Sequence, residues 1–287
     1  MVNSRYLLTL FAILVTSFSF QPFTYAIDAA FEHSEYDQIE FDSNGDTITG
    51  YFLKAKPNGK TAAAVLLPAC GGILHWRSRK IFPFYRDMVS VLTDAGVSVM
   101  LIDSLSPRDE KQLCSTPAPD RSITFETRRN DGFNAMFYLR TRDDIIKDKI
   151  FLVTYGANGS IDAMNKKSDA YKEAKGGYAG AILFYPHCGG GQQVDFSPYA
   201  PVQVFIGEDD AWNPPGECRE LAQRVVNGSA QFNLKVYPDT LHGFVWRIEP
   251  KMFYKYHAGP VMVGANYESA EDAYKRTTEF VTKIINQ

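Results

Sequence analysis

Three segments of the chain carry chemically useful residues directly after apolar runs that are typical of buried strands. Residues 202–206 lead into an acidic turn that contains Asp210, and residues 234–237 lead to His242. A third apolar run leads into Gly156 and then a helical pattern. A histidine held by a buried carboxylate keeps one tautomer and can act as a general base. We therefore expect Asp210 and His242 to pair at the edge of a cleft that binds a small molecule.

The elements that must position these residues alternate between strand and helix. We expect strands at residues 36–42, 47–55, 62–67, 97–102, 150–154, 181–185, 202–206 and 234–237, and helices at residues 81–95, 125–139, 161–174, 216–226 and 268–285. This alternation indicates a mostly parallel, twisted sheet with helices on both faces, whose ligands bind beyond the carboxyl ends of the strands. The order of turn, acid and histidine along the chain is that of the triad in the α/β-hydrolase fold, which is the fold class that we predict.

The first residues have the layout of a secretory signal. Arg5 precedes an apolar run over residues 6–18, and Ala26 offers a small residue to a signal peptidase. We predict a signal peptide at residues 1–26, a single domain at residues 27–287, and a periplasmic or extracellular location. The alternative is a membrane anchor, but the apolar run is shorter than the roughly 20 residues that a spanning helix needs.

Charge and cysteine content narrow the range of partners. A net charge of −3 gives no electrostatic reason to expect nucleic acid, or a membrane beyond the export step. The four cysteines lack the paired spacing of a structural zinc site, so we expect neither a metal nor a cofactor. An even number of cysteines in an exported protein favours two disulfides, and sequence alone permits three pairings.

The placement of the cysteines on the expected elements suggests one of these pairings. Cys188 ends one strand, and Cys218 opens the helix after the next strand. Cys70 and Cys114 follow neighbouring strands. We therefore predict the pairs Cys70–Cys114 and Cys188–Cys218.

Four motifs together resemble the dienelactone hydrolase family of the α/β-hydrolase superfamily, over nearly all of residues 27–287. Residues 65–72 are similar to the family's oxyanion loop, where many members read His-Gly-Cys-Gly-Gly, and residues 103–108 are similar to its Asp-Ser-x-x-x-Arg segment. Residues 207–214 match its acid turn, and residues 237–244 match its histidine turn. The resemblance implies an ester or lactone as substrate, Asp210 and His242 as catalytic acid and histidine, and an oxyanion pocket at Ala69, Cys70 and Ala157. Trp212 and Phe244 flank the acid and the histidine, so we expect both to wall the pocket.

The chain departs from the family at the turn that carries the nucleophile. Members of the family have the pattern Gly-x-Ser/Cys-x-Gly-Gly at this turn, whereas residues 154–159 of this chain are Thr-Tyr-Gly-Ala-Asn-Gly. Alignment on Gly159 places Gly156 at the nucleophile position. Glycine has no side chain, so no acyl-enzyme can form on it. Ser160 and a reduced Cys70 are the substitutes that the neighbourhood offers.

Three hypotheses follow, in order of preference. The first is a ligand-binding protein of hydrolase ancestry with a diverged or lost nucleophilic activity, which would make it a pseudoenzyme. The second is an ester or lactone hydrolase in which the Asp210–His242 pair activates water directly. The third is nucleophilic catalysis from Cys70 or Ser160. His187, which follows another strand end, is a further candidate for the cleft.

Overall fold

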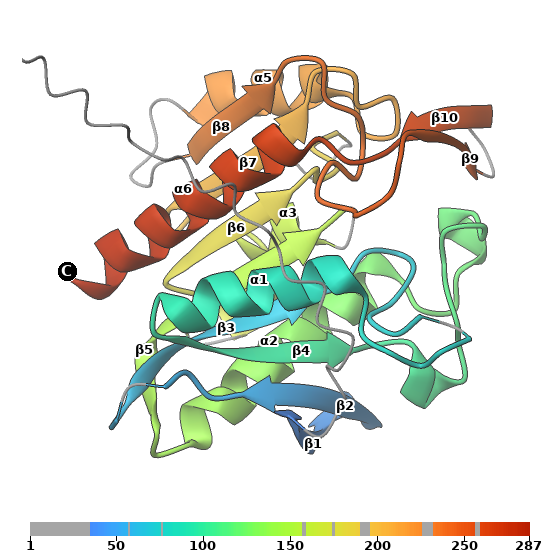
Figure 1. The fold of residues 1–287 in the computed structure, drawn as a ribbon. Helices are drawn as coiled ribbons and strands as arrows, with labels where there is room; N and C mark the ends of the chain where they lie inside the picture. Colours follow the sequence, from blue (N-terminus) through green and yellow to red (C-terminus); the bar gives the residue numbers. More distant parts are fainter. Residues whose placement is uncertain are drawn as a thin grey trace, which may run out of the picture. The chain divides into compact units, whose positions relative to one another are not determined.

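A single eight-stranded sheet organises the part of the chain that the computed structural model describes (Figure 1). The described residues are 35–287 without 57, 76, 157–158, 174–175, 190–195, 226–231 and 256–258. They fall within one compact unit, Glu32–Gln287. The expected signal peptide at residues 1–26 and the expected pocket residue Ala157 lie outside the described residues, so both stay predictions.

The sheet has the order β1-β2-β4-β3-β5-β6-β7-β8. Its strands are β1 (Asp37–Ser43), β2 (Asp46–Leu53), β3 (Thr61–Leu67), β4 (Val97–Asp103), β5 (Ile145–Tyr155), β6 (Gly180–Phe184), β7 (Val202–Gly207) and β8 (Phe232–Tyr237). Strands β1 and β2 pair antiparallel, as does β2 with β4, and the remaining pairs are parallel. The predicted fold class is therefore confirmed.

Helices cover both faces of the sheet. They are α1 (Pro83–Asp94), α2 (Phe125–Thr141), α3 (Ser160–Ala163), α4 (Asp169–Glu173), α5 (Pro215–Val225) and α6 (Tyr267–Ile285), with short 3₁₀ turns η2 (Ser106–Arg108) and η3 (Ala118–Asp120). Figure 1 shows α1 and α6 in front of the sheet and α2 behind it. Every residue of β3 and β4 is buried, which agrees with their mostly apolar sequences between two helix layers.

Local signals set where these helices begin. Pro83 opens α1, a position where the missing N–H has no helical acceptor in any case. Thr124 and Thr127 form a reciprocal capping box at the start of α2. The side chain of Asn266 accepts the Ser269 N–H at the start of α6.

The single helix that we expected over residues 161–174 was wrong. The chain forms two short helices, α3 and α4, because polar side chains between them bond the backbone in competition with a helical ladder. The Asn165 side chain accepts the N–H groups of Lys167 and Ser197, and Ser168 Oγ accepts the N–H of Tyr171 to start α4.

A two-stranded hairpin, which the sequence pattern did not indicate, lies between the histidine turn and α6. It consists of β9 (Lys251–Lys255) and β10 (Gly259–Val263). Val263 forms a parallel bridge with His242, and the Gly264 N–H donates to the His242 carbonyl at 3.1 Å. The hairpin therefore fixes the backbone on which His242 sits. No helix in the described ranges is long and apolar enough to cross a bilayer.

Candidate active site

The acid and the histidine lie together at the carboxyl edge of the sheet. His242 Nδ1 lies 2.8 Å from Asp210 Oδ2, and both side chains are buried. The other carboxylate oxygen, Oδ1, accepts the backbone N–H groups of Trp212 at 2.9 Å and Asn213 at 2.7 Å. These two bonds fix the carboxylate, which in turn orients the imidazole. The second ring nitrogen, Nε2, has no hydrogen-bond partner among the described residues.

The acid turn and the histidine turn are locked to each other by backbone contacts. The Asp209 N–H donates to the Thr240 carbonyl at 3.0 Å, and the Glu208 N–H donates to the Tyr237 carbonyl at 2.8 Å. A Cβ at Gly207 would lie 2.0 Å from the Thr240 carbonyl oxygen, so only glycine permits this approach. The two backbone hydrogen bonds and the close approach at Gly207 therefore set the distance between Asp210 and His242.

Aromatic rings enclose His242. Trp212 stacks on the imidazole with centroids 5.0 Å apart, Tyr185 lies at 4.6 Å, and Trp246 meets its edge at 5.6 Å. Trp212 lines the cavity, as expected. Phe244 does not: it is fully buried and packs on Tyr185, because its side chain lies in the core instead of facing the ligand edge.

The turn after β5 contains Gly156, which we aligned with the nucleophile position of the family. Gly156 has φ +71° and lines the same cavity as His242. A Cβ there would meet only Ala69 Cβ, at 3.9 Å, among the described atoms beyond its chain neighbours. At Gly159 a Cβ would lie 2.8 Å from the Phe125 carbonyl oxygen, so that glycine is required by the packing of α2. Ser160 is buried and does not line this cavity.

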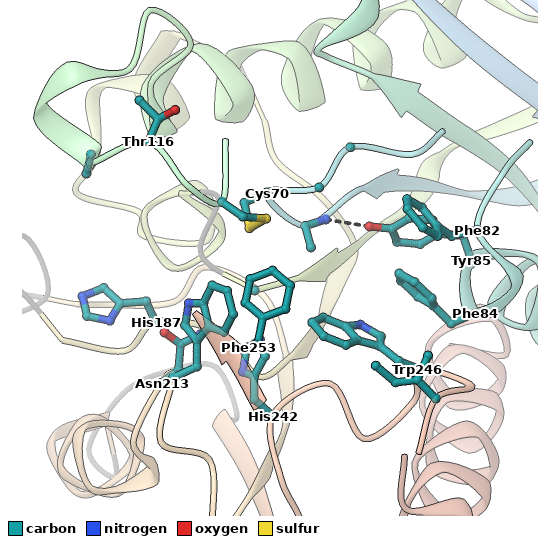
Figure 2. Close-up of a pocket in the computed structure, with 18 of the residues that line it drawn as sticks. Cys70, Phe82, Phe84, Tyr85, Thr116, His187, Asn213, His242, Trp246 and Phe253 are labelled. Carbon is teal, nitrogen blue, oxygen red and sulfur yellow. Dashed lines mark hydrogen bonds between the residues drawn. A yellow bond between two sulfur atoms is a disulfide. The ribbon is translucent and has the colours of Figure 1, made fainter. Parts of the chain in front are cut away.

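The expected oxyanion loop after β3 is held from both sides. The Ala69 N–H donates to Tyr85 Oη at 2.7 Å (Figure 2). Buried Arg128 donates through Nη2 to the carbonyls of Pro68 and Ala69, and burial lowers the pKa of its guanidinium to about 10. These bonds draw the carbonyls toward Arg128. The Cys70 N–H has no hydrogen-bond partner among the described residues and is left as a donor.

Both expected disulfides are present. Cys70–Cys114 joins the oxyanion loop to the long loop before α2, and both cysteines line the cavity. Cys188–Cys218 joins the segment after β6 to α5 and is buried. Cys70 is therefore not a free thiol, which removes it as a nucleophile while the bridge is intact.

The cavity is large, aromatic and free of carboxylates among its described lining residues. Its volume is about 560 Å³. Its aromatic walls are Phe82, Phe84, Tyr85, Phe125, Trp212, Trp246 and Phe253. Figure 2 shows Phe84 and Trp246 side by side in this wall. His187, which we considered as a candidate for the cleft, also lines this cavity. Its Nδ1 atom lies 3.4 Å from Glu217 Oε2.

Three cations line the same cavity. Arg247 forms an ion pair with Asp87, whereas Arg121 and Lys251 have no acidic partner among the described residues. Arg121 donates to the Thr116 carbonyl at 2.8 Å, and partial burial lowers the pKa of its guanidinium. The electrostatic character of the cavity therefore favours an anionic ligand.

Sequence reasoning missed Tyr85, Arg128, Arg121 and Phe253. Tyr85 and Arg128 sit on helices that read as ordinary packing elements, and no pattern in the sequence distinguishes them from neighbouring residues. Phe253 comes from the hairpin and lies 5.2 Å from the Trp212 ring. Arg121 lies in the segment before α2, where the sequence shows no regular pattern that would single it out.

The chain was compared with known proteins and protein families. Residues 85–285 match the Dienelactone hydrolase family. A curated relative, "Probable 2-oxo-3-(5-oxofuran-2-ylidene)propanoate lactonase" of Bradyrhizobium sp, is 22% identical over 218 residues, which cover 72% of this chain and 83% of the relative.

Two solved structures share the fold. The esterase Est2 of Thermogutta terrifontis with propionate bound has a TM-score of 0.61 at 16% identity, covering 88% of this chain and 96% of its own. Est1E of Butyrivibrio proteoclasticus has a TM-score of 0.56 at 13% identity, covering 87% of this chain and 99% of its own. With the family match extending from α1 to α6, the chain belongs to the dienelactone hydrolase family.

Proposed function

We propose that this protein binds a small, ring-containing anion in the cavity beside Asp210 and His242, and that it does not form an acyl-enzyme. The observation that carries the proposal is that Gly156 lines the cavity without a side chain. We infer that it stands at the family's nucleophile position. Covalent catalysis needs a hydroxyl or thiol within reach of the histidine. Ser160 is buried elsewhere, and Cys70 is bonded to Cys114.

The ligand class follows from the lining. Aromatic walls favour a flat or ring-containing molecule, and Arg121 and Lys251 favour a negative charge. The lactonase relative is named for an anionic lactone, and Est2 has been solved with propionate bound, which agrees with this class. Two disulfides are typical of an oxidising compartment and support export.

The test is reaction with a fluorophosphonate probe, together with hydrolysis of p-nitrophenyl acetate and butyrate. We expect no covalent labelling by intact-protein mass spectrometry and ester turnover close to that of the buffer. Stoichiometric labelling of the unaltered protein would overturn the proposal. Peptide mapping would then identify the residue that had reacted.

A second candidate function is hydrolysis by a water molecule that His242 activates. The intact 2.8 Å contact between Nδ1 and Asp210, with Nε2 unbonded, favours it over any nucleophilic route. Its signature is ester or lactone turnover that persists after fluorophosphonate treatment and disappears in His242→Gln.

A further inference from the structure

The Cys70–Cys114 disulfide lies in the wall of the cavity, whereas the second disulfide does not. Cys70 and Cys114 are half-buried and line the cavity, and Figure 2 shows the Cys70 side chain among the other lining residues. Cys188 and Cys218 are only 1% and 0% exposed, and neither lines it. A thiolate opens a disulfide only if it reaches one of the two sulfur atoms. The first bridge is therefore open to a small thiol in the cavity, and the second bridge is a control within the same chain.

The Cys70–Cys114 bridge ties one segment of the cavity wall, residues 114–121, to the oxyanion loop. Apart from Cys114, the cavity-lining residues of this segment are Thr116, Pro117, Ala118 and Arg121. Among the described residues, its hydrogen bonds run only within the segment or to the neighbouring residues 112 and 113. Arg121 also lies over the Phe125 ring, 5.5 Å from its centroid. The segment therefore depends on the disulfide for its attachment across the cavity wall.

Buried residues hold the chain on both sides of this segment. Leu113 and Ile123 pack with Leu105 in a small apolar cluster, against which Cys70 also packs. The Leu113 N–H donates to the Cys70 carbonyl at 2.7 Å. Opening the disulfide therefore leaves both ends anchored and frees only the residues between them. A local opening of this kind requires less free energy than unfolding of the whole domain.

The charge of the cavity favours thiol exchange at this bridge. Arg121 and Lys251 line the cavity without an acidic partner among the described residues, and its described lining contains no carboxylate. A positive environment stabilises a thiolate, which is the form in which a cysteine leaves when its disulfide opens. The same environment concentrates anionic thiols in the cavity. An accessible sulfur and a positive surrounding are together typical of reactive cysteine pairs.

We propose that Cys70–Cys114 is a reversible redox site, at which small anionic thiols open the bridge and thereby release residues 114–121 from the cavity wall. One thiolate attacks a cysteine sulfur, the S–S bond breaks, and the other cysteine leaves as a thiolate. A second thiolate then attacks the mixed disulfide, which yields the small-molecule disulfide and the second cysteine thiolate. Two thiols are thus oxidised and the protein disulfide is reduced, and the cysteine thiolates take up the protons that the thiols released. The exchange requires no bound anion, so it holds or fails independently of the proposed function.

The first experiment compares the opening of the two disulfides by 3-mercaptopropionate, 2-mercaptoethanol and cysteamine, which are anionic, neutral and cationic at neutral pH. Samples are alkylated over time and mapped as peptides. Each rate is divided by the rate of the same thiol with 2-hydroxyethyl disulfide, which corrects for intrinsic reactivity. We expect Cys70–Cys114 to open at least about tenfold faster than Cys188–Cys218, because its sulfurs are accessible.

The charge of the thiol should also change the rate at Cys70–Cys114. We expect the corrected rate of the anionic thiol to exceed that of the cationic thiol at least about threefold at low salt, because the cavity is positive. In about 1 M salt the Debye length falls to about 3 Å, so this ratio should approach one.

The second experiment measures the release of residues 114–121 by brief digestion with trypsin. Cleavage after Arg121 should be at least about tenfold faster in protein whose Cys70–Cys114 bridge has been reduced and alkylated than in the oxidised protein. The double variant Cys70→Ser and Cys114→Ser should be cleaved at the same place without any thiol. The matched control, Cys188→Ser and Cys218→Ser, should keep the slow cleavage after Arg121. Circular dichroism establishes that each variant is folded.

Four results would overturn the proposal. They are equal opening of the two disulfides, corrected rates at low salt that do not depend on the charge of the thiol, unchanged cleavage after Arg121 in the reduced protein, and cleavage spread over the whole chain. The last result would mean that reduction unfolds the domain instead of releasing one segment, and the reduced natural sequence tests this even if the double variant does not fold.

Discussion

The β7–β8 side and the β3–β5 side of the cavity differ in the side chains that they carry. On the β7–β8 side, Asp210 and His242 are paired, and Gly207 lets their turns interlock. On the β3–β5 side, Gly156 lines the cavity without a side chain, and the Ala69 N–H is bonded to Tyr85.

The contrast shows which parts of such a site the fold depends on. Asp210 accepts two backbone N–H groups and a ring nitrogen inside the protein, so its loss would leave buried donors unpaired. A nucleophile side chain projects into a cavity and supports nothing around it. The fold therefore needs Asp210 for structural reasons, whether or not the residue takes part in a reaction.

The largest expected effect is on covalent labelling and ester hydrolysis, and it comes from placing a hydroxyl group at residue 156. Gly156→Ser should change fluorophosphonate labelling from none to detectable, and should raise ester hydrolysis at least about tenfold, well below the ~10⁶-fold value of a nucleophile in a serine protease. The positive φ costs about 1–2 kcal/mol for a residue with a side chain, which lowers the melting temperature.

Gly156→Ala is the matched control for this substitution, because it carries the same backbone strain without a hydroxyl. It should melt near the serine variant and stay unlabelled. If both variants are unlabelled, His242 is not placed to activate a residue at this position.

The two disulfides provide a second comparison of the two sides. Replacing Cys188 and Cys218 together by serine should lower the free energy of unfolding by about 2–4 kcal/mol, measured by urea denaturation. Under native conditions a small dithiol should reduce Cys70–Cys114 first, because it lines the cavity whereas Cys188 and Cys218 are buried. Alkylation and peptide mapping over time give the order, and simultaneous reduction would contradict it.

Asp210→Asn tests the hydrogen bonds on the β7–β8 side of the cavity. The amide oxygen can still accept the two backbone N–H groups, but its NH₂ would face the Nδ1–H of His242. We expect a loss of about 1.5–3 kcal/mol in the free energy of unfolding, the value of a buried hydrogen bond to a charged group. His242→Gln serves as a partner in a double-mutant cycle, and additive effects would show that the two residues do not interact.

The smallest expected change in the free energy of unfolding comes from a substitution beside the oxyanion loop. Tyr85→Phe removes the acceptor of the Ala69 N–H without changing the packing of the ring, and should cost about 0.5–1.5 kcal/mol. Tyr155→Phe, at another buried ring in contact with Tyr85, controls for general loss of a phenol. A Tyr85 effect no larger than the control would mean that water replaces the phenol at this N–H.

The strand segments along the chain, both disulfides and the proximity of Asp210 and His242 were predictable from the sequence. Each depends on residues at strand ends, and the alternation of apolar runs fixes which strand ends share an edge. The break between α3 and α4 was not predictable, because it depends on the Asn165 side chain accepting the N–H of Ser197, a residue that is remote in the sequence. The hairpin and the core position of Phe244 were missed for the same reason, since non-local packing decides both.

The stacking of Trp212 on His242 has a spectroscopic consequence. Two of the three tryptophans of the chain, Trp212 and Trp246, line the cavity and contact this imidazole. An indole loses emission when a nearby imidazole ring gains a positive charge. The intrinsic fluorescence of the unmodified protein is therefore an optical readout of the charge on His242, and it requires no attached dye.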